Sequence, residues 1–218
     1  MTAPAMDISL ELLRMDVPPG PRTLFQIGAL RIAAGEHVAI TGPSGVGKTT
    51  LLEIIAGLLL PSAGRVLVGG RDVTRMGNRE RCLMRRERIG IVFQRLNLIS
   101  YLTTEENVAL PLAPGPVSRR AAAEAMDRIG IGGLRSRRVA DLSPGEQQRV
   151  AAARVLAGHP LVVLADEPTS SLDDRNAGEV LDALSEAAGG KTMVVVSHDP
   201  RVRRGFDRVL DFGSLCAP

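Results

Sequence analysis

The chain has 218 residues, 44% of them hydrophobic, which suffices for one α/β domain with a sizeable core and an inserted subdomain but not for two independent domains. Its formal net charge is only +3, yet all but two of the 27 basic residues are arginines, with clusters at residues 79–88 and 135–138. Because there is no Trp and only one Tyr to stack on bases, these clusters indicate solvated helix faces or contacts with a partner, and no nucleic acid is expected to bind.

The first elements that the sequence predicts are two strands. Residues 8–12 alternate apolar and polar side chains, and residues 24–32 do so less strictly, as in antiparallel strands with one buried face. Residues 17–21 read Val-Pro-Pro-Gly-Pro and predict the turn between them. The chain is therefore expected to open with an antiparallel β subdomain.

Residues 42–49 fit the pattern G-x-x-x-x-G-K-(S/T) of a phosphate-binding loop. They are Gly42, Pro43, Ser44, Gly45, Val46, Gly47, Lys48 and Thr49, with Thr50 following. The glycines let the backbone wrap around a polyphosphate, while N–H groups and the start of the next helix direct partial positive charge at it. Lys48 adds a full charge at the β- and γ-phosphates, and Thr49 offers a hydroxyl to Mg²⁺. A buried strand predicted at residues 37–41 and a helix at 50–56 flank the loop, so the sequence predicts binding of ATP or GTP.

Strands and helices alternate through the rest of the chain. Apolar strands are predicted at residues 65–68, 89–93, 161–166 and 192–197, with a helix over 174–188 before the last of them. Such alternation is typical of a parallel sheet covered on both faces. It is interrupted by a helical stretch from 103 to 138, in which Ser118 is predicted to cap a helix over 119–129.

These elements together predict an α/β fold: a P-loop nucleoside triphosphatase core with a parallel sheet, an N-terminal antiparallel β subdomain and an inserted α-helical subdomain. One domain is expected over residues 1–218. Its nucleotide-binding core covers about residues 1–95 and 159–218, and its helical subdomain about residues 96–158.

Two carboxylates follow the strand at residues 161–165. Asp166 and Glu167 are expected at the carboxyl edge of a parallel sheet, where such sheets place their ligands. Asp166 is predicted to hold Mg²⁺ through water, and Glu167 to orient and polarise the attacking water. Solvated acids at a strand end are the alternative, which the phosphate loop in the same chain disfavours.

Residues 142–150 form the second diagnostic stretch and predict the start of a helix. Ser143 can cap it, Pro144 suits its first position, and Glu146 lies three residues after the cap to complete a capping box. Ser143 and the N–H of Gly145 would then form an exposed helix N-terminus, which attracts phosphate.

In this order, the motifs resemble those of the ATP-binding-cassette ATPases. The phosphate loop, Gln94 in Val92-Phe93-Gln94, the stretch from Leu142 and the run Leu164-Ala165-Asp166-Glu167-Pro168-Thr169 are followed by Ser170-Ser171-Leu172-Asp173 and Ser197-His198-Asp199. Within that family, residues 165–169 with Gln147 and Arg149 look most like the small ATPases of lipoprotein-release, macrolide-export and cell-division systems.

The resemblance implies a function for the remaining site residues. Two copies would stack head to tail and trap two ATP molecules, each between one copy's phosphate loop and the other copy's signature residues Ser143, Gly145 and Glu146. Gln94 would reach Mg²⁺ and the nucleophilic water, and His198 would hydrogen-bond the γ-phosphate. Asp173 would cross the dimer interface.

Two departures from the family pattern affect nucleotide binding. The signature usually reads Leu-Ser-Gly-Gly-Gln, but here Pro144 removes one N–H donor and Glu146 adds a carboxylate. No aromatic residue occurs around residues 13–15, where one is expected to stack on adenine. Arg14 or Phe25 are candidate substitutes, and weaker adenine affinity is the more direct inference.

These motifs are compatible with three classes of function. The first is the ATPase subunit of a transporter, docked on a separate permease; the others are a non-transport cassette ATPase and a small-molecule kinase with a phosphate loop. The two cysteines lie far apart and form no C-x-x-C pair, no apolar run reaches the ~18 residues of a membrane span, and the N-terminus lacks the features of a signal peptide. The chain is therefore expected in the cytoplasm, peripheral on the inner face of the cell membrane.

The segment after Gln94, residues 95–102, is more apolar than a solvated loop requires. It is expected to line a groove for a short permease helix, with Tyr101 and Leu98 as contacts. Packing of Leu96, Leu98 and Ile99 into the core is the alternative.

Overall fold

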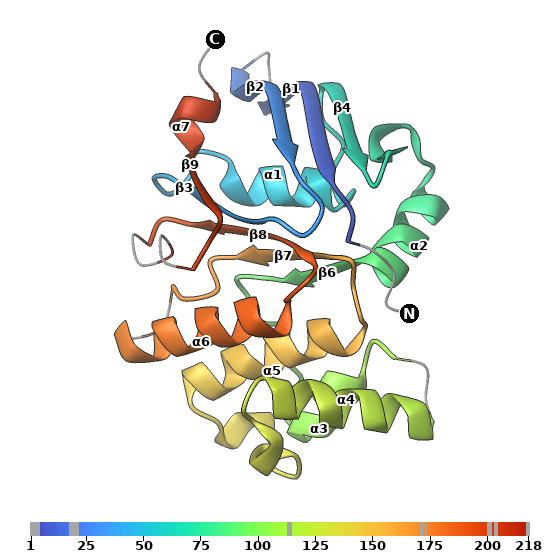
Figure 1. Cartoon of the computed structure of the whole chain (residues 1–218), viewed down its shortest axis with the longest axis vertical. Coiled ribbons are helices and arrows are strands. Elements are labelled where there is room, and N and C mark those ends of the chain that lie inside the picture. Colours follow the sequence, from blue (N-terminus) through green and yellow to red (C-terminus); the bar gives the residue numbers. More distant parts are fainter. Residues whose placement is uncertain are drawn as a thin grey trace.

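The computed structural model places helix α1 (Lys48–Ile55) between two sheets (Figure 1). The structure describes residues 5–17, 22–112, 115–170, 172, 174–199, 202 and 205–216. Apart from Val17, the turn predicted at residues 17–21 lies outside them. None of the helices in this part of the chain has the length and hydropathy of a membrane span.

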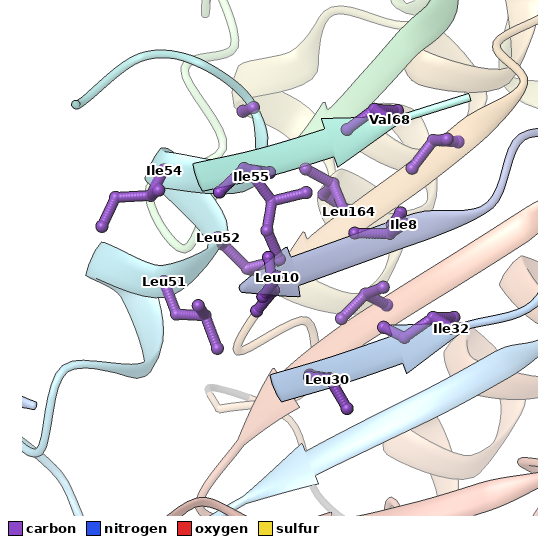
Figure 2. Packing of buried hydrophobic residues seen from close by; sticks show 14 of the residues in the cluster. Ile8, Leu10, Leu30, Ile32, Leu51, Leu52, Ile54, Ile55, Val68 and Leu164 are labelled. Carbon is purple, nitrogen blue, oxygen red and sulfur yellow. The ribbon is translucent and has the colours of Figure 1, made fainter. Parts of the chain in front are cut away.

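The first sheet is antiparallel, with strand order β2-β1-β4-β5. Its strands are β1 (Ile8–Val17), β2 (Arg22–Ile32), β4 (Ala63–Val68) and β5 (Arg71–Asp72). Alternate side chains of β1 are buried and face α1, so that Ile8 and Leu10 lie among Leu51, Leu52 and Ile55 (Figure 2). The apolar positions of the alternation predicted for the N-terminal strands thus form the face of this sheet that packs on α1.

The second sheet is parallel, with strand order β6-β7-β8-β3-β9. Its strands are β3 (His37–Thr41), β6 (Ile89–Val92), β7 (Val162–Asp166), β8 (Thr192–Ser197) and β9 (Arg208–Asp211). Every residue of β7 and β8 is buried, because α1 covers one face and helices α5 (Pro144–Ala157) and α6 (Asp174–Ala187) the other (Figure 1). Strand β9 was not predicted, because its four residues begin with Arg208 and end with Asp211 and form no apolar run; the strand is held by pairing with β3.

Two further helices complete the helical subdomain below α5 in Figure 1: α3 (Thr104–Ala109) and α4 (Pro116–Arg128). Their apolar side chains join those of α5 and α6 in one cluster. The predicted cap of α4 is wrong: the helix begins at Pro116, and the Ser118 hydroxyl is buried and donates to the Gly115 carbonyl over 2.7 Å. The proline ring already has the φ of a first helical turn, which starts the helix earlier.

Helix α2 (Asn78–Arg88) lies beside β6 and carries the arginines of residues 79–88. The short helix α7 (Phe212–Leu215) follows β9 and places Phe212 edge-to-face on Phe25, with ring centroids 5.5 Å apart. Both rings are buried, so Phe25 belongs to the core.

Candidate functional site

The loop between β3 and α1 needs glycine for its shape. Gly45 has a φ of 81° and Gly47 a φ of 110°, which side-chain-bearing residues rarely adopt. A Cβ on Gly47 would also lie 2.7 Å from Cδ1 of Phe25. The backbone conformation thus favours glycine at both positions, and packing against Phe25 is a second, independent reason at Gly47.

Lys48 is the first residue of α1, yet its ammonium group turns back to the loop. The Nζ atom donates to the carbonyls of Gly42 and Pro43, each over 2.8 Å, and lies 3.8 Å from Oε1 of Glu167. The residue is 5% exposed. A buried cation is therefore held at the loop by neutral carbonyls and one carboxylate, a setting in which an anionic ligand binds favourably.

The Thr49 hydroxyl lies 3.0 and 2.9 Å from the two carboxylate oxygens of Asp166 and donates to this group. Asp166 is 6% exposed, and burial raises the pKa of its carboxyl, with the hydrogen bond from Thr49 acting in the opposite direction. The hydroxyl oxygen of Thr49, just after the loop, and the carboxylate oxygens of Asp166, at the end of β7, therefore lie close together.

This oxygen pair fits Mg²⁺. Among the described residues, no group of three His, Cys, Asp or Glu side chains could enclose a metal ion. An ion here would take its other ligands from water and phosphate, as Mg²⁺ usually does in sites with one or two protein oxygens. The donor set therefore suits a nucleotide-bound magnesium better than a permanent metal centre.

Glu167 follows β7 in a left-handed backbone conformation, with a φ of 47°. Its Oε2 accepts a 2.8 Å hydrogen bond from the Ser197 hydroxyl, and its Oε1 accepts one of 3.0 Å from the His198 N–H and lies 2.8 Å from His198 Nδ1. Strain at a residue whose side chain is so fully held is typical of functional sites. The end of β8 therefore positions the carboxylate at the end of β7.

These strand ends meet at a cavity of about 240 Å³. It is lined by Leu24, Ser44, Gly45, Gly47, Lys48, Thr49, Thr50, Gln94, Glu167 and His198. Of the other loop residues, Val46 packs against the core, and Gly42 and Pro43 supply the carbonyls that hold Lys48. Asp166 lies beneath Thr49, outside this lining.

The signature residues lie elsewhere, at the start of α5. The predicted capping box is confirmed: Glu146 N–H donates to the Ser143 hydroxyl over 3.3 Å, and the Ser143 N–H donates to Oε2 of Glu146 over 2.7 Å. This backbone N–H lowers the pKa of the Glu146 carboxyl. Ser143, Gly145 and Glu146 do not line the cavity of their own chain, and Glu146 is engaged with its own helix cap.

Comparison with known proteins shows which family this chain belongs to. The model of the family described as "ABC transporter" matches residues 26–170, about two thirds of the chain. The chain belongs to the ABC transporter family. This membership sets aside the alternative of a small-molecule kinase with a phosphate loop.

Among the cassette's relatives, an uncharacterized ABC transporter ATP-binding protein of Mycobacterium tuberculosis is 42% identical over 212 residues, which are 94% of this chain and 64% of that protein. A macrolide export ATP-binding/permease protein of Paracoccus denitrificans is 43% identical over 187 residues, 84% of this chain and 28% of that protein. The cassette thus spans less than two thirds of these curated relatives. The second relative agrees with the branch predicted from residues 165–169.

Among solved structures, the ATP-binding cassette MJ0796, a dimer in a post-hydrolysis state bound to ADP and Pi, superposes with a TM-score of 0.84 at 36% identity. That comparison covers 94% of this chain and 93% of the other. CbiO1 from Clostridium perfringens, described as part of the transporter complex cbiONQ, has a TM-score of 0.79 at 31% identity and covers 88% of this chain and 78% of its own. The predicted α/β fold, with parallel sheet, antiparallel sheet and helices, is confirmed.

Phe25 and Arg14 are the two candidates for stacking on adenine in place of the usual aromatic residue. Phe25 cannot stack on adenine from its buried place beneath Gly47, and Arg14 is paired with Asp16 over 3.0 Å. Asp173 lies outside the described residues. Ser197 is a site residue that was not predicted, although its position beside His198 at the end of an apolar strand was a signal for it.

A second hollow of about 480 Å³ lies between α2, β6 and the end of α5, and we call it the arginine groove. Its charged lining residues are Arg85, Arg86, Arg88 and Arg154. Its apolar lining includes Leu58, Ile89, Ile91, Phe93, Val155 and Pro160. No Asp or Glu is among its described lining residues.

The segment at residues 95–102 contributes less to this groove than expected. Leu96 and Leu98 pack against the helical cluster, as in the alternative of core packing. Tyr101 is 74% exposed but does not line the groove, whereas Asn97 does. The choice of Leu98 and Tyr101 as groove contacts is therefore not supported by the geometry.

Proposed function

We propose that the chain is the ATP-hydrolysing, nucleotide-binding subunit of an ABC transporter. ATP binding and hydrolysis in a head-to-tail dimer would drive movements of a separate membrane permease. The observation that carries this proposal is the convergence of Lys48, Glu167 and His198, from three different strand ends, on one cavity of about 240 Å³. The cavity lies at the carboxyl edge of the parallel sheet, which is where α/β proteins bind and transform ligands.

The phosphate loop binds the nucleotide through its backbone. We assign to the phosphates the backbone N–H groups of Gly42, of residues 44–47 and of the start of α1. Thr50 lines the same cavity. Lys48 exchanges its two carbonyl partners for phosphate oxygens, which carry charge and bind an ammonium group more strongly than neutral carbonyls do.

Glu167 orients and polarises the attacking water. Ser197 and His198 hold its carboxylate, so that the group needs no reorganisation when charge develops on the phosphate. The His198 ring is about half exposed and lines the cavity, where it can donate to the γ-phosphate. Both residues are therefore assigned to catalysis, together with Lys48 and Gln94.

The magnesium site is assigned to Thr49, Gln94 and Asp166. When bound, Mg²⁺ supplies positive charge that stabilises the phosphate oxygens during transfer. Thr49 and Asp166 already lie within hydrogen-bond distance of each other, and Gln94 lines the cavity from the end of β6. Burial makes the Asp166 carboxylate costly to ionise, and a nearby cation would offset this cost.

The signature residues are assigned to the nucleotide of a second copy of the chain. Ser143 and Gly145 form the N-terminus of α5, and neither lines its own chain's cavity. A phosphate held at this helix start must therefore belong to another cavity. Asp173 is assigned to the same dimer interface on the resemblance alone.

The permease is proposed as a separate chain, with the cassette on the inner face of the membrane. The arginine groove is the docking site we propose for it, since an exposed apolar hollow of this size marks an interaction surface. The comparison with CbiO1, described as part of a transporter complex, supports this assembly.

Glu167→Gln tests the proposal. The purified chain should hydrolyse ATP only with Mg²⁺, and the variant should bind ATP but lose about a hundredfold or more in turnover, because the carboxylate acts on water rather than on the nucleotide. Glu186→Gln, on an exposed residue of α6, is the matched control. Turnover of the Glu167 variant within threefold of the parent would refute the assignment.

The same variant tests the composite site. With ATP it should elute as a dimer and without ATP as a monomer, and salt should weaken the dimer because charge supplies part of the contact. A monomer at saturating ATP would contradict the assignment of Ser143 and Gly145.

A further inference from the structure

A small cavity of about 20 Å³ lies where α1 meets the ends of β6 and β7. Among its described lining residues, three have polar or charged side chains: Thr49, Glu53 and Asp166. The rest are apolar, namely Leu52, Ala56, Leu58, Ile91 and Phe93. Thr49 also lines the nucleotide cavity, whereas Glu53 and Asp166 do not. The small cavity therefore lies behind the Thr49–Asp166 oxygen pair, on the side away from the nucleotide.

Glu53 is the residue of this lining that has no assigned function. It follows Thr49 by four residues on α1, so the two side chains lie on the same face of the helix, with Cβ atoms about 5–6 Å apart. The residue is partly buried. Within the described ranges of the chain, its carboxylate makes no hydrogen bond or ion pair. A partly desolvated charge without a partner is unfavourable by itself, so its presence here requires a reason.

The charges around the oxygen pair do not balance within the chain. Lys48 lies 3.8 Å from Oε1 of Glu167, so these two charges offset each other. Asp166 is bonded to the neutral Thr49 hydroxyl. Burial raises the pKa of the Asp166 carboxyl most, and the charges of Glu167 and Glu53 raise it further. Asp166 and Glu53 are therefore two interacting carboxylates whose combined charge a divalent cation would balance.

A fixed negative charge behind the oxygen pair acts differently on two forms of the nucleotide. Metal-free ATP carries more negative charge than its magnesium complex, and a carboxylate repels its phosphates. In the complex, the cation belongs at Thr49 and Asp166, which border Glu53, and the phosphates belong in the nucleotide cavity beyond them. Because the energy between charges falls with distance, attraction to the cation offsets repulsion of the phosphates.

We propose that Glu53 is a specificity-determining residue, which makes the nucleotide cavity select the magnesium complex of ATP over metal-free ATP. The inference rests on the proposed function for the magnesium site at Thr49 and Asp166. Glu53 does not touch the nucleotide; its carboxylate supplies the second negative charge at this site and acts through the bound cation.

Nucleotide binding to the purified chain tests this inference without any turnover. The probe is mant-ATP, a fluorescent ATP analogue, titrated once with excess Mg²⁺ and once with EDTA. The parent should bind more tightly with Mg²⁺. In Glu53→Gln the ratio of the two Kd values should fall about fivefold, equivalent to about 1 kcal/mol, because metal-free nucleotide is repelled less and the cation is attracted less. The affinity for Mn²⁺, measured by electron paramagnetic resonance with ATP present, should fall in the same variant.

Two further variants separate charge from shape and position. Glu53→Asp keeps the negative charge on a shorter side chain and should retain most of the parent's ratio. Glu186→Gln, on an exposed residue of α6, makes the same change in net charge as Glu53→Gln outside the small cavity and should leave the ratio unchanged. Thermal melting of all three variants verifies that they are folded.

Other results would overturn the inference. A parent-like ratio in Glu53→Gln would show that Glu53 is an ordinary carboxylate on a helix surface, and an equal fall in Glu186→Gln would show an effect of net charge alone. An equal fall in Glu53→Asp would assign the effect to packing. If the parent itself bound mant-ATP equally with Mg²⁺ and with EDTA, the magnesium site of the proposed function would fail, whereas the first three outcomes leave that site intact.

Discussion

The nucleotide cavity lies at the strand ends of the parallel sheet and the arginine groove along its edge strand β6, and the two sites differ in how their charged groups are partnered. In the cavity, Lys48 is held by two carbonyls, Asp166 by Thr49 and Glu167 by Ser197 and His198. In the groove, the guanidinium groups face apolar side chains without a carboxylate partner.

The difference concerns how each site holds its own charged groups. The polar groups of the cavity are bonded within the chain, which preorganises them, whereas the arginines of the groove have no carboxylate partner among the described residues. The two also share a boundary: a small cavity of about 20 Å³ is lined by Thr49 and Asp166 on one side and by Leu58, Ile91 and Phe93 of the groove on the other.

The largest effect is expected from a change that destroys preorganisation of the nucleotide cavity alone. Gly47→Ala places a methyl group 2.7 Å from the Phe25 ring in a left-handed conformation, which should cost on the order of 2–4 kcal/mol of unfolding free energy and abolish ATP binding. The control is Gly28→Ala on β2, where a Cβ meets nothing within 4 Å. Denaturant unfolding and nucleotide titration measure both effects; a variant that still binds ATP as the parent does would show that the loop tolerates strain.

A smaller effect should separate positioning from binding in the same cavity. Ser197→Ala removes the donor to Oε2 of Glu167, and turnover should fall about tenfold, equivalent to about 1.4 kcal/mol, as for a lost hydrogen bond to a charged group. ATP affinity should not change. Ser197→Thr keeps the hydroxyl and should restore much of the rate, whereas a loss in both variants would indicate a packing defect.

The smallest effect should test whether the two regions are independent. Phe93 borders the groove and the small cavity beneath Asp166, so Phe93→Ala should lower turnover by about threefold through loosened packing around that carboxylate. Val155→Ala, which lines the groove but not the small cavity, is the control and should leave turnover unchanged. Equal turnover in the two variants would show that packing at the wall shared by the groove and the small cavity does not affect catalysis.

Most features that depend on residues close in the sequence were predicted, with the N-cap of α4 as an exception. The capping box of α5 needs only Ser143 and Glu146, three residues apart, and the phosphate loop is one contiguous run between a strand and a helix. Period-two and continuous apolar runs indicated the antiparallel and parallel sheets. Local hydrogen bonds and side-chain periodicity determine such features, so the features can be predicted without knowing which segments pack together in the fold.

Features that join distant segments required the tertiary structure. The contact of Ser197 with Glu167 spans 30 residues and exists because β7 and β8 are adjacent in the sheet order. The gathering of four arginines around one hollow and the packing of Leu98 against the helical cluster, beside the exposed Tyr101, depend likewise on which elements pack together. The amino-acid sequence therefore determined which chemical groups this cassette carries, and packing decided which of them meet, because burial and charge pairing are properties of neighbours in space.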